Sequence, residues 1–195
     1  MPKSKRDKLL ELLADQSLHL QSVTLSSGKS SNYYIDGKMV ATTPEGAPLI
    51  AEAIRDAIGN MQVDAVGGIT IGADPMLGAL SGRGYFRTFI VRKEPKSHGL
   101  NKWIEGQLNK DDKRVVFIDD VATTGGSILK GLEMLKIEFP QIEIVKIIVL
   151  VDREEGAKEN LRKKGYTLES IFTSKELIAE KERQKEDSPK WMKAA

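Results

Sequence analysis

Two adjacent aspartates, Asp119 and Asp120, stand just before a short run that is rich in hydroxyl groups and glycine. The run consists of Thr123, Thr124, Gly125, Gly126 and Ser127. Its glycines allow backbone N–H groups to approach an anion closely, and its hydroxyls can donate further hydrogen bonds. An amphipathic stretch follows at 128–137, and the amino terminus of a helix favours negative charge. Residues 123–127 therefore have the chemistry of a cradle for a phosphate monoester.

The two carboxylates need a different partner, because they would repel a phosphate held in the same cradle. A ribose diol or a Mg²⁺ ion suits them better. The segment is not a P-loop, since no lysine follows the glycines, and it lacks the G-x-G-x-x-G dinucleotide fingerprint. It resembles the PRPP-binding motif of the type I phosphoribosyltransferases, in which an apolar strand and two acids precede a Thr/Gly-rich loop for the 5-phosphate. The alternative is an ordinary strand-to-helix turn with two solvated acids.

A second polar segment, at 92–106, follows another apolar run and carries several cations, one histidine and two glycines. Because it has no apolar periodicity, we predict a loop at 93–103 that is mobile without ligand. Next to a leaving group, such a loop can close, exclude water and stabilise the charge that develops on the departing oxygens. The alternative is a solvated basic loop without a ligand.

Three stretches resemble orotate phosphoribosyltransferase in particular. Arg-Lys-Glu-x-Lys-x-His-Gly begins at residue 92 and is followed by Ile-Glu-Gly at 104–106. Leu-Ser-Ser-Gly-Lys-x-Ser-x-Tyr-Tyr-Ile-Asp occupies 25–36, and Val-Asp-Arg-Glu-Glu-Gly occupies 151–156. These stretches resemble the catalytic loop, the amino-terminal substrate segment and the late strand-end motif of that family, in the same order.

The resemblance implies that Lys96, His98 and Asp120 are catalytic, with Lys96 the main contributor. Asp119 and Asp120 would bind the ribose hydroxyls, and the cationic loop would contact the pyrophosphate oxygens. The implied PRPP-binding residues are Arg92, Lys93, Lys96, His98, Asp119, Asp120, Val121, Ala122, Thr123, Thr124, Gly125, Gly126 and Ser127.

The resemblance also implies an orotate site. Arg153 would hold the orotate carboxylate, which a guanidinium fork can bind through two hydrogen bonds. Tyr34 and Ile35 would lie against the pyrimidine ring, and Thr123 would also contact it. Tyr34 has an alternative role as an ordinary core residue.

The chain departs from the family pattern at residue 26 and again in the turn after the apolar run at 65–71, which has Ile71-Gly72 where some relatives carry an aromatic–Lys pair. Many members carry a lysine before the Ser-Gly pair, and this chain has Ser26 there. That cation is therefore missing, or it is supplied by Lys29 or Lys38. The turn after the apolar run at 65–71 occupies the place of the family's pyrophosphate loop, and Pro75 is placed to open a helix.

The elements that must position these residues form an α/β pattern. Apolar runs predict strands at 65–71, 86–91, 115–118 and 142–151, with helical stretches between most of them. This alternation predicts a central, mostly parallel sheet flanked by helices.

Local patterns predict three amino-terminal elements: a helix at 9–18, a hairpin-like unit at 23–36 and a helix that begins at Pro44. We expect a single phosphoribosyltransferase domain over residues 1–195. It would have a small amino-terminal hood at about 1–40, and its charged end would form a solvated helix followed by a tail at about 181–195.

Composition narrows the function classes. The net charge is +2 over 195 residues, so no affinity for nucleic acid is expected from the chain as a whole. The chain has no cysteine, which excludes thiol chemistry and is consistent with a cytoplasmic protein. No apolar run approaches the length of a membrane span, and the charged start lacks the core of a signal peptide.

The resemblance implies transfer of the phosphoribosyl group of PRPP to orotate, which forms orotidine 5′-monophosphate and pyrophosphate in pyrimidine (UMP) biosynthesis. The family uses Mg²⁺, held mainly by PRPP and water with no direct protein ligand, and it acts as a homodimer that shares the 93–103 loop. The alternatives are the same fold acting on another base, a non-catalytic PRPP-binding regulator, and a nucleic-acid binder that uses the basic loop.

Overall fold

The computed structural model describes residues 3–21, 23–24, 30–95 and 102–187. Within them, a central sheet has the strand order β10-β9-β8-β5-β6-β7 and is parallel except for β7. The strands are β5 (Ala65–Ile69), β6 (Thr88–Val91), β7 (Ile104–Gly106), β8 (Arg114–Ala122), β9 (Glu143–Asp152) and β10 (Leu168–Thr173). The predicted α/β class with a mostly parallel sheet is confirmed.

Strand β8 is longer than its apolar run. The run predicts a strand that ends at Ile118, but pairing with β9 continues through Asp119 and Val121 to Ala122. Asp119 and Asp120 therefore lie inside the strand and not in the turn after it. Two strands, β7 and β10, were not predicted, because neither has the continuous apolar run of a buried central strand.

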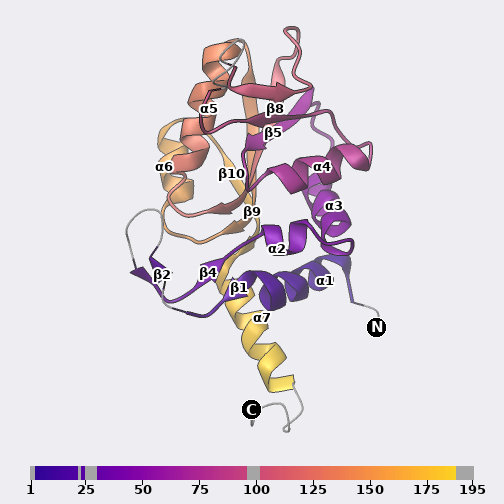
Figure 1. The fold of residues 1–195 in the computed structure, drawn as a ribbon, viewed down its shortest axis with the longest axis vertical. Coiled ribbons are helices and arrows are strands. Elements are labelled where there is room, and N and C mark those ends of the chain that lie inside the picture. Colours follow the sequence, from indigo (N-terminus) through magenta and orange to yellow (C-terminus); the bar gives the residue numbers. More distant parts are fainter. Residues whose placement is uncertain (1–2, 22, 25–29, 96–101, 188–195) are drawn as a thin grey trace.

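Helices cover both faces of the sheet (Figure 1): α5 and α6 lie on one face, and α3 and α4 on the other. Their bounds are α3 (Gly46–Ile58), α4 (Asp74–Gly82), α5 (Gly126–Glu138) and α6 (Ala157–Lys163). Helix α3 begins at Gly46, two residues after the predicted start. The hydroxyl of Thr43 accepts the Gly46 N–H at 2.9 Å and its carbonyl accepts the Ala47 N–H at 3.0 Å, so Thr43 caps the turn that contains Pro44 and leads into the helix.

The amino-terminal segment forms a hood beside the carboxyl ends of the strands (Figure 1). Its elements are α1 (Lys5–Leu12), the π-helical turn η1 (Leu13–Ser17), β1 (Leu18–His19), β2 (Val23–Thr24), β3 (Ser30–Ser31), β4 (Tyr34–Ile35) and α2 (Lys38–Ala41). Strands β2 and β3 pair as the predicted hairpin, whereas β4 pairs with β1. The final helix α7 (Ser174–Asp187) packs against α1 and η1.

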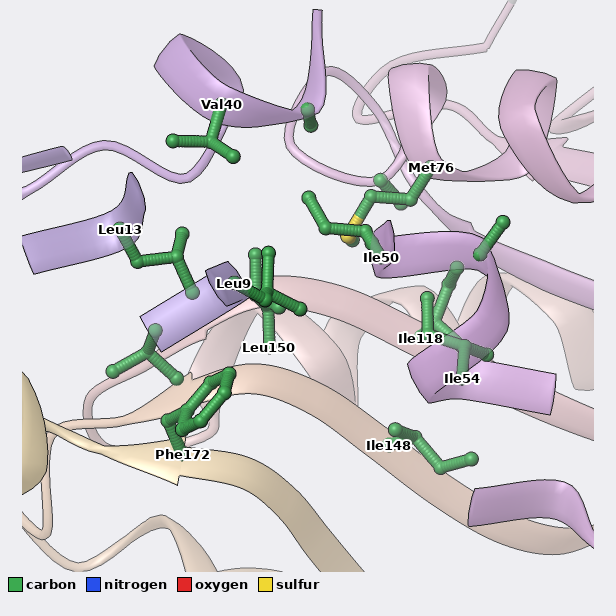
Figure 2. Packing of buried hydrophobic residues seen from close by; sticks show 14 of the residues in the cluster. Leu9, Leu13, Val40, Ile50, Ile54, Met76, Ile118, Ile148, Leu150 and Phe172 are labelled. Atoms are coloured by element: carbon green, nitrogen blue, oxygen red, sulfur yellow. The ribbon is translucent and has the colours of Figure 1, made fainter. Parts of the chain in front are cut away.

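The hood shares its core with one face of the sheet. Figure 2 shows Leu9 and Leu13 from the hood packed beside Leu150 and Phe172 from the sheet. Ile54 of α3 belongs to the same cluster. The opposite face has its own buried cluster under α5 and α6. Because hood and sheet bury side chains in one cluster, the hood is held in a fixed position over the strand ends.

Among the described residues, none of the helices combines the length and the apolar character needed to cross a membrane.

Candidate active site

A pocket of about 460 Å³ lies where the carboxyl ends of β5, β8 and β9 meet the hood. This edge of a parallel sheet is where α/β proteins commonly bind ligands. Most of the predicted site residues that the structure describes line it: Tyr34, Ile35, Lys93, Asp119, Asp120, Val121, Ala122, Thr123, Thr124, Gly125, Gly126, Ser127 and Arg153.

The two aspartates form the floor of the pocket. Asp119 is 6% exposed, and its Oδ1 accepts the Asp120 N–H at 3.0 Å. Asp120 Oδ1 accepts the Val121 N–H at 2.9 Å. Burial raises the pKa of Asp119 well above its usual value, and the neighbouring Asp120 carboxylate adds to that increase. Burial also raises the pKa of Asp120, although the Lys38 ammonium opposes the increase. Burial therefore disfavours the ionised form of both carboxyl groups when no ligand is present.

Two glycines enclose the acid pair. A Cβ added to Gly72 would lie 2.3 Å from Asp120 Oδ1 and 3.0 Å from Asp119 Oδ1. A Cβ added to Gly37 in the hood would lie 3.0 Å from Asp120 Cβ. Gly72 belongs to the turn after β5, whose Thr70–Ile71 peptide bond is cis. The backbone of the predicted pyrophosphate loop therefore lies directly against the carboxylates.

The phosphate cradle follows at the end of β8. Gly125 has a φ of 80°, which L-residues with side chains rarely adopt, and α5 begins at the next residue. The first N–H groups of a helix have no acceptor within the helix, so at α5 they can bind an anion. Asn160 of α6 donates to the Thr124 carbonyl at 3.0 Å and fixes the loop from behind.

Arg153 is buried at the end of β9, although it is charged and lines the pocket. Its Nη2 donates to Ser31 Oγ at 2.8 Å and lies 2.8 Å from Glu155 Oε1, while its guanidinium lies 4.4 Å from the centre of the Tyr33 ring. Its Nε is buried and has no hydrogen-bond partner. An unpaired buried donor costs about 1–3 kcal/mol, which an incoming carboxylate could recover.

The hood supplies the remaining wall of the pocket. Ile35 is buried, whereas Tyr34 is 40% exposed at the mouth of the pocket. The alternative of Tyr34 as a core residue is therefore wrong, and Tyr33 beside it is the partly buried tyrosine. The exposed face of Tyr34 is free to pack against a planar ring.

The cationic loop is described only at its ends. Lys93 lines the pocket, but Arg92 does not; its guanidinium lies 3.6 Å from Glu105. The Arg92 N–H donates to the Trp103 carbonyl at 2.8 Å, which joins the two ends of the loop. Lys96 and His98 lie outside the described residues, so their catalytic roles and the predicted mobility of 93–103 stay predictions.

Several residues at the site are absent from the predicted PRPP and orotate sites, among them Ser31, Tyr33, Gly72 and Glu155, and Lys38 is predicted there only as one of two substitutes for the lysine missing at Ser26. The first two contact Arg153 from the hood, and Lys38 lines the pocket. Glu155, two residues from Arg153, could have been found from its charge and spacing. The hood contacts have no local signal, because they join residues far apart in the sequence. Within the described ranges, no three His, Asp or Glu side chains form a group that could hold a metal ion.

Comparisons with known proteins agree with this geometry. A family model described as a phosphoribosyl transferase domain matches residues 36–180. An orotate phosphoribosyltransferase of Aquifex aeolicus is 40% identical over 182 residues, which cover 89% of this chain and 98% of that protein. One from Methanocaldococcus jannaschii is 41% identical over 174 residues, which cover 89% of this chain and 97% of that protein.

A solved structure extends the comparison to three dimensions. The orotate phosphoribosyltransferase of Mycobacterium tuberculosis, crystallised in complex with PRPP, superposes with a TM-score of 0.74 at 30% identity. The match covers 90% of this chain and 99% of that one. Sequence and fold thus give the same assignment: the chain belongs to the phosphoribosyltransferases and, among them, to the orotate phosphoribosyltransferase family.

Proposed function

We propose that the pocket under the hood transfers the phosphoribosyl group of PRPP to orotate. The C1–O bond to pyrophosphate breaks, and the electron pair leaves with pyrophosphate. A ring nitrogen of orotate bonds to C1 and gives up its proton, which yields orotidine 5′-monophosphate. The observation that carries this proposal is Arg153, a buried arginine with an unpaired donor that lines the same pocket as an acid pair and a phosphate cradle.

The PRPP end of the pocket is assigned from the β8 segment. Asp119 and Asp120 accept hydrogen bonds from the ribose hydroxyls, and residues 121–127 hold the 5-phosphate. The pair also places negative charge near C1, where the sugar becomes cationic as the leaving group departs. The protein thus contributes charge stabilisation and positioning, and no covalent nucleophile is required.

The pyrophosphate end belongs to the loop. Lys96 and His98, with Arg92 and Lys93, contact the pyrophosphate oxygens when the loop closes. Support for this comes from Lys93, which lines the pocket at the point where the loop begins.

Mg²⁺ fits this pocket as a companion of PRPP. A buried carboxylate and a mostly buried one beside an anion cradle favour a cation, and the oxygens of PRPP and water would hold it. When bound, Mg²⁺ neutralises charge on the pyrophosphate group.

At the orotate end, Arg153 binds the carboxylate, while Tyr34 and Ile35 pack against the ring and Thr123 contacts its edge. An arginine at this position is the feature that favours orotate over a base without a carboxylate. Transfer to another base is the second candidate, since the PRPP end would serve either reaction.

The experiment is a panel of bases. The purified chain is incubated with PRPP, Mg²⁺ and orotate, uracil, adenine or hypoxanthine, and pyrophosphate release is followed. We expect release with orotate alone. Release with adenine or hypoxanthine and none with orotate would overturn the assignment of the base.

Three further assignments belong to the same proposal: a homodimer that shares the 93–103 loop, a place in pyrimidine biosynthesis, and a cytoplasmic location. They are supported by the membership of the family and by the loop ends, which converge at the edge of the sheet.

A further inference from the structure

Lys38 connects the hood to the acid pair. It is the first residue of α2, its side chain is 31% exposed, and it lines the pocket. Its Nζ lies 2.5 Å from Asp36 Oδ1 and 3.8 Å from Asp120 Oδ2. Lys38 therefore lies between one carboxylate of the hood and one carboxylate of the sheet.

Asp36 fixes the position of Lys38. Its Oδ1 accepts the Lys38 backbone N–H at 3.1 Å as well as the ammonium, and its own N–H donates to the Ser17 carbonyl at 3.0 Å. Burial lowers the pKa of Lys38, but the hydrogen bond to Asp36 and the charge of Asp120 outweigh burial and raise it overall. The lysine is therefore a fixed positive charge.

The two oxygens of Asp120 have different surroundings. Oδ1 accepts the Val121 N–H and lies against Gly72, whereas Oδ2 is the oxygen nearest to Lys38. A separation of 3.8 Å is too long for a hydrogen bond, so Lys38 acts on Oδ2 through its charge and leaves the lone pairs of that oxygen available.

The charged groups around the two pocket acids show why the charge of Lys38 matters for Asp120. The charged groups around Asp120 are Asp119, Asp36 and Lys38, and Lys93 acts on Asp119. Burial favours the neutral form of both pocket acids, in which one oxygen becomes a hydrogen-bond donor, whereas an ionised carboxylate only accepts hydrogen bonds. Lys38 is the nearby cation that opposes this effect of burial on the pKa of Asp120.

We propose that Lys38 is a positioning residue that holds the Asp120 carboxylate in place as an acceptor for the ribose hydroxyls of PRPP. Lys38 is thereby committed to two carboxylates, so it is not a spare cation for orotate in place of the lysine absent at Ser26. The inference rests on the proposed function, because it assumes that Asp120 binds the ribose of PRPP.

The test compares Lys38→Met, Lys38→Gln and Lys38→Arg with a matched control, Lys146→Met. Lys146 is also a partly buried lysine with a carboxylate partner: its Nζ lies 2.7 Å from Glu169 and donates to the Ala57 carbonyl, away from the pocket. Titration calorimetry gives separate Kd values for PRPP with Mg²⁺ and for orotate, and circular dichroism checks the fold.

We expect Lys38→Met and Lys38→Gln to raise the Kd for PRPP about tenfold or more, with less than about a twofold change for orotate. Lys38→Arg should restore most of the PRPP affinity, because it returns the charge, and Lys146→Met should change neither value.

Four outcomes would overturn the inference. An unchanged Kd for PRPP in folded Lys38→Met or Lys38→Gln would show that Lys38 does not act on Asp120. A larger loss for orotate would make Lys38 a base contact. Equal losses for both ligands without rescue by arginine, or the same loss in Lys146→Met, would make its role structural. If the unaltered chain binds PRPP but does not convert orotate, the proposed function fails while the Lys38 result still stands.

Discussion

At the scale of single residues, we expect the acid pair to lower the stability of the apo protein, because burial disfavours its charged form. Asp119 is buried and Asp120 beside it is mostly buried, and Lys38, the cation beside Asp120, is too far away to donate a hydrogen bond to it. Without a ligand, the folded chain must hold two neighbouring carboxylates away from water. Sites of this kind are where stability and function oppose each other.

Whether the Asp119 carboxylate lowers the stability of the apo protein can be tested with Asp119→Asn. The pKa of Asp119 is raised in the folded chain, so folding favours the protonated form. Stability is therefore lost as pH rises from about 4, the value for an unfolded aspartate, through the raised folded value. Asparagine has no such titration and keeps an oxygen to accept the Asp120 N–H.

We expect the Tm of apo Asp119→Asn to exceed that of the unaltered chain at pH 7, and this gain to shrink towards pH 4. Thermal unfolding from pH 4 to 8 measures it. PRPP affinity at pH 7 should fall in the same variant. A lower Tm for the variant at pH 7 would show that the carboxylate stabilises the apo fold.

Arg153→Ala should separate the two ligands. We expect it to lose about 2–4 kcal/mol of orotate binding, because a charge-assisted double contact is removed, while PRPP binding survives. Calorimetry with each ligand decides this. Arg183→Ala, which removes an exposed arginine paired with Glu180 on α7, is the control. Equal damage to both ligands would show that Arg153 holds the pocket together through Ser31 and Tyr33.

The types of many site residues could be predicted from the sequence, but their contacts could not. The acid pair, the cradle and Arg153 lie in compact motifs at strand ends. Ser31 reaches Arg153 across 122 positions, and Lys38 reaches Asp120 only because the hood packs over the strand ends. Such pairs depend on tertiary packing, for which the local sequence carries no signal.

At the scale of elements, central strands were easier to predict than edges. Strands β8 and β9 are buried on both faces and show as apolar runs. The edge strand β10 mixes polar and apolar residues, and the edge strand β7 has only three residues. Neither shows an apolar run in the sequence, so each is recognised only by its pairing with the neighbouring strand. For the same reason, β8 extends through Asp119 and Asp120: its ladder with β9 continues after the apolar run ends.

Glycine at the centre of the sheet has a packing role that can be measured. A Cβ on Gly67 of β5 would lie 2.1 Å from the buried ring of Phe89 on β6. Gly67→Ala should therefore destabilise the fold by about 1–3 kcal/mol through overpacking. Chemical denaturation gives the free energy of unfolding.

The matched control for this prediction is Gly78→Ala in α4, where nothing lies within 4 Å of the added Cβ. This change should stabilise the helix by up to about 1 kcal/mol, because alanine is the better helix former. If both substitutions had the same sign, contact with Phe89 would not explain the glycine at 67.

At the scale of the whole molecule, hood, sheet and loop have separate tasks around one pocket. The hood and one face of the sheet share a buried cluster (Figure 2), so the walls of the pocket are fixed with respect to each other. The loop is attached at the far edge of the sheet, where β6 pairs with β7. We propose that the loop serves the pocket of a partner subunit, while Lys93 at its start lines the pocket of its own chain.

Subunit mixing tests the shared loop. Lys96→Ala chains are mixed with chains carrying Asp119→Asn and Asp120→Asn, each expected to be nearly inactive alone. If the loop acts on the partner, a mixed dimer has one site with both defects and one intact site. Half of the dimers are mixed after random exchange of equal amounts, so roughly a quarter of all sites should be active.

The control for this experiment is the amount of mixed dimer, which differently tagged chains reveal. If the loop serves its own subunit, every site keeps one defect and activity stays at the level of the separate variants. Absence of recovery with mixed dimers present would therefore place Lys96 in the pocket of its own chain.

The hydrogen bond between the Arg92 N–H and the Trp103 carbonyl has an evolutionary consequence. It joins the loop ends at a ladder in which Val91 faces Ile104, so the polypeptide leaves the sheet and returns to it at the same place. The length and composition of the intervening segment can then change without altering the register of any strand. If the loop acts in turnover as proposed, we expect mutations in this segment to change turnover with little effect on stability, so that selection can act on each property separately.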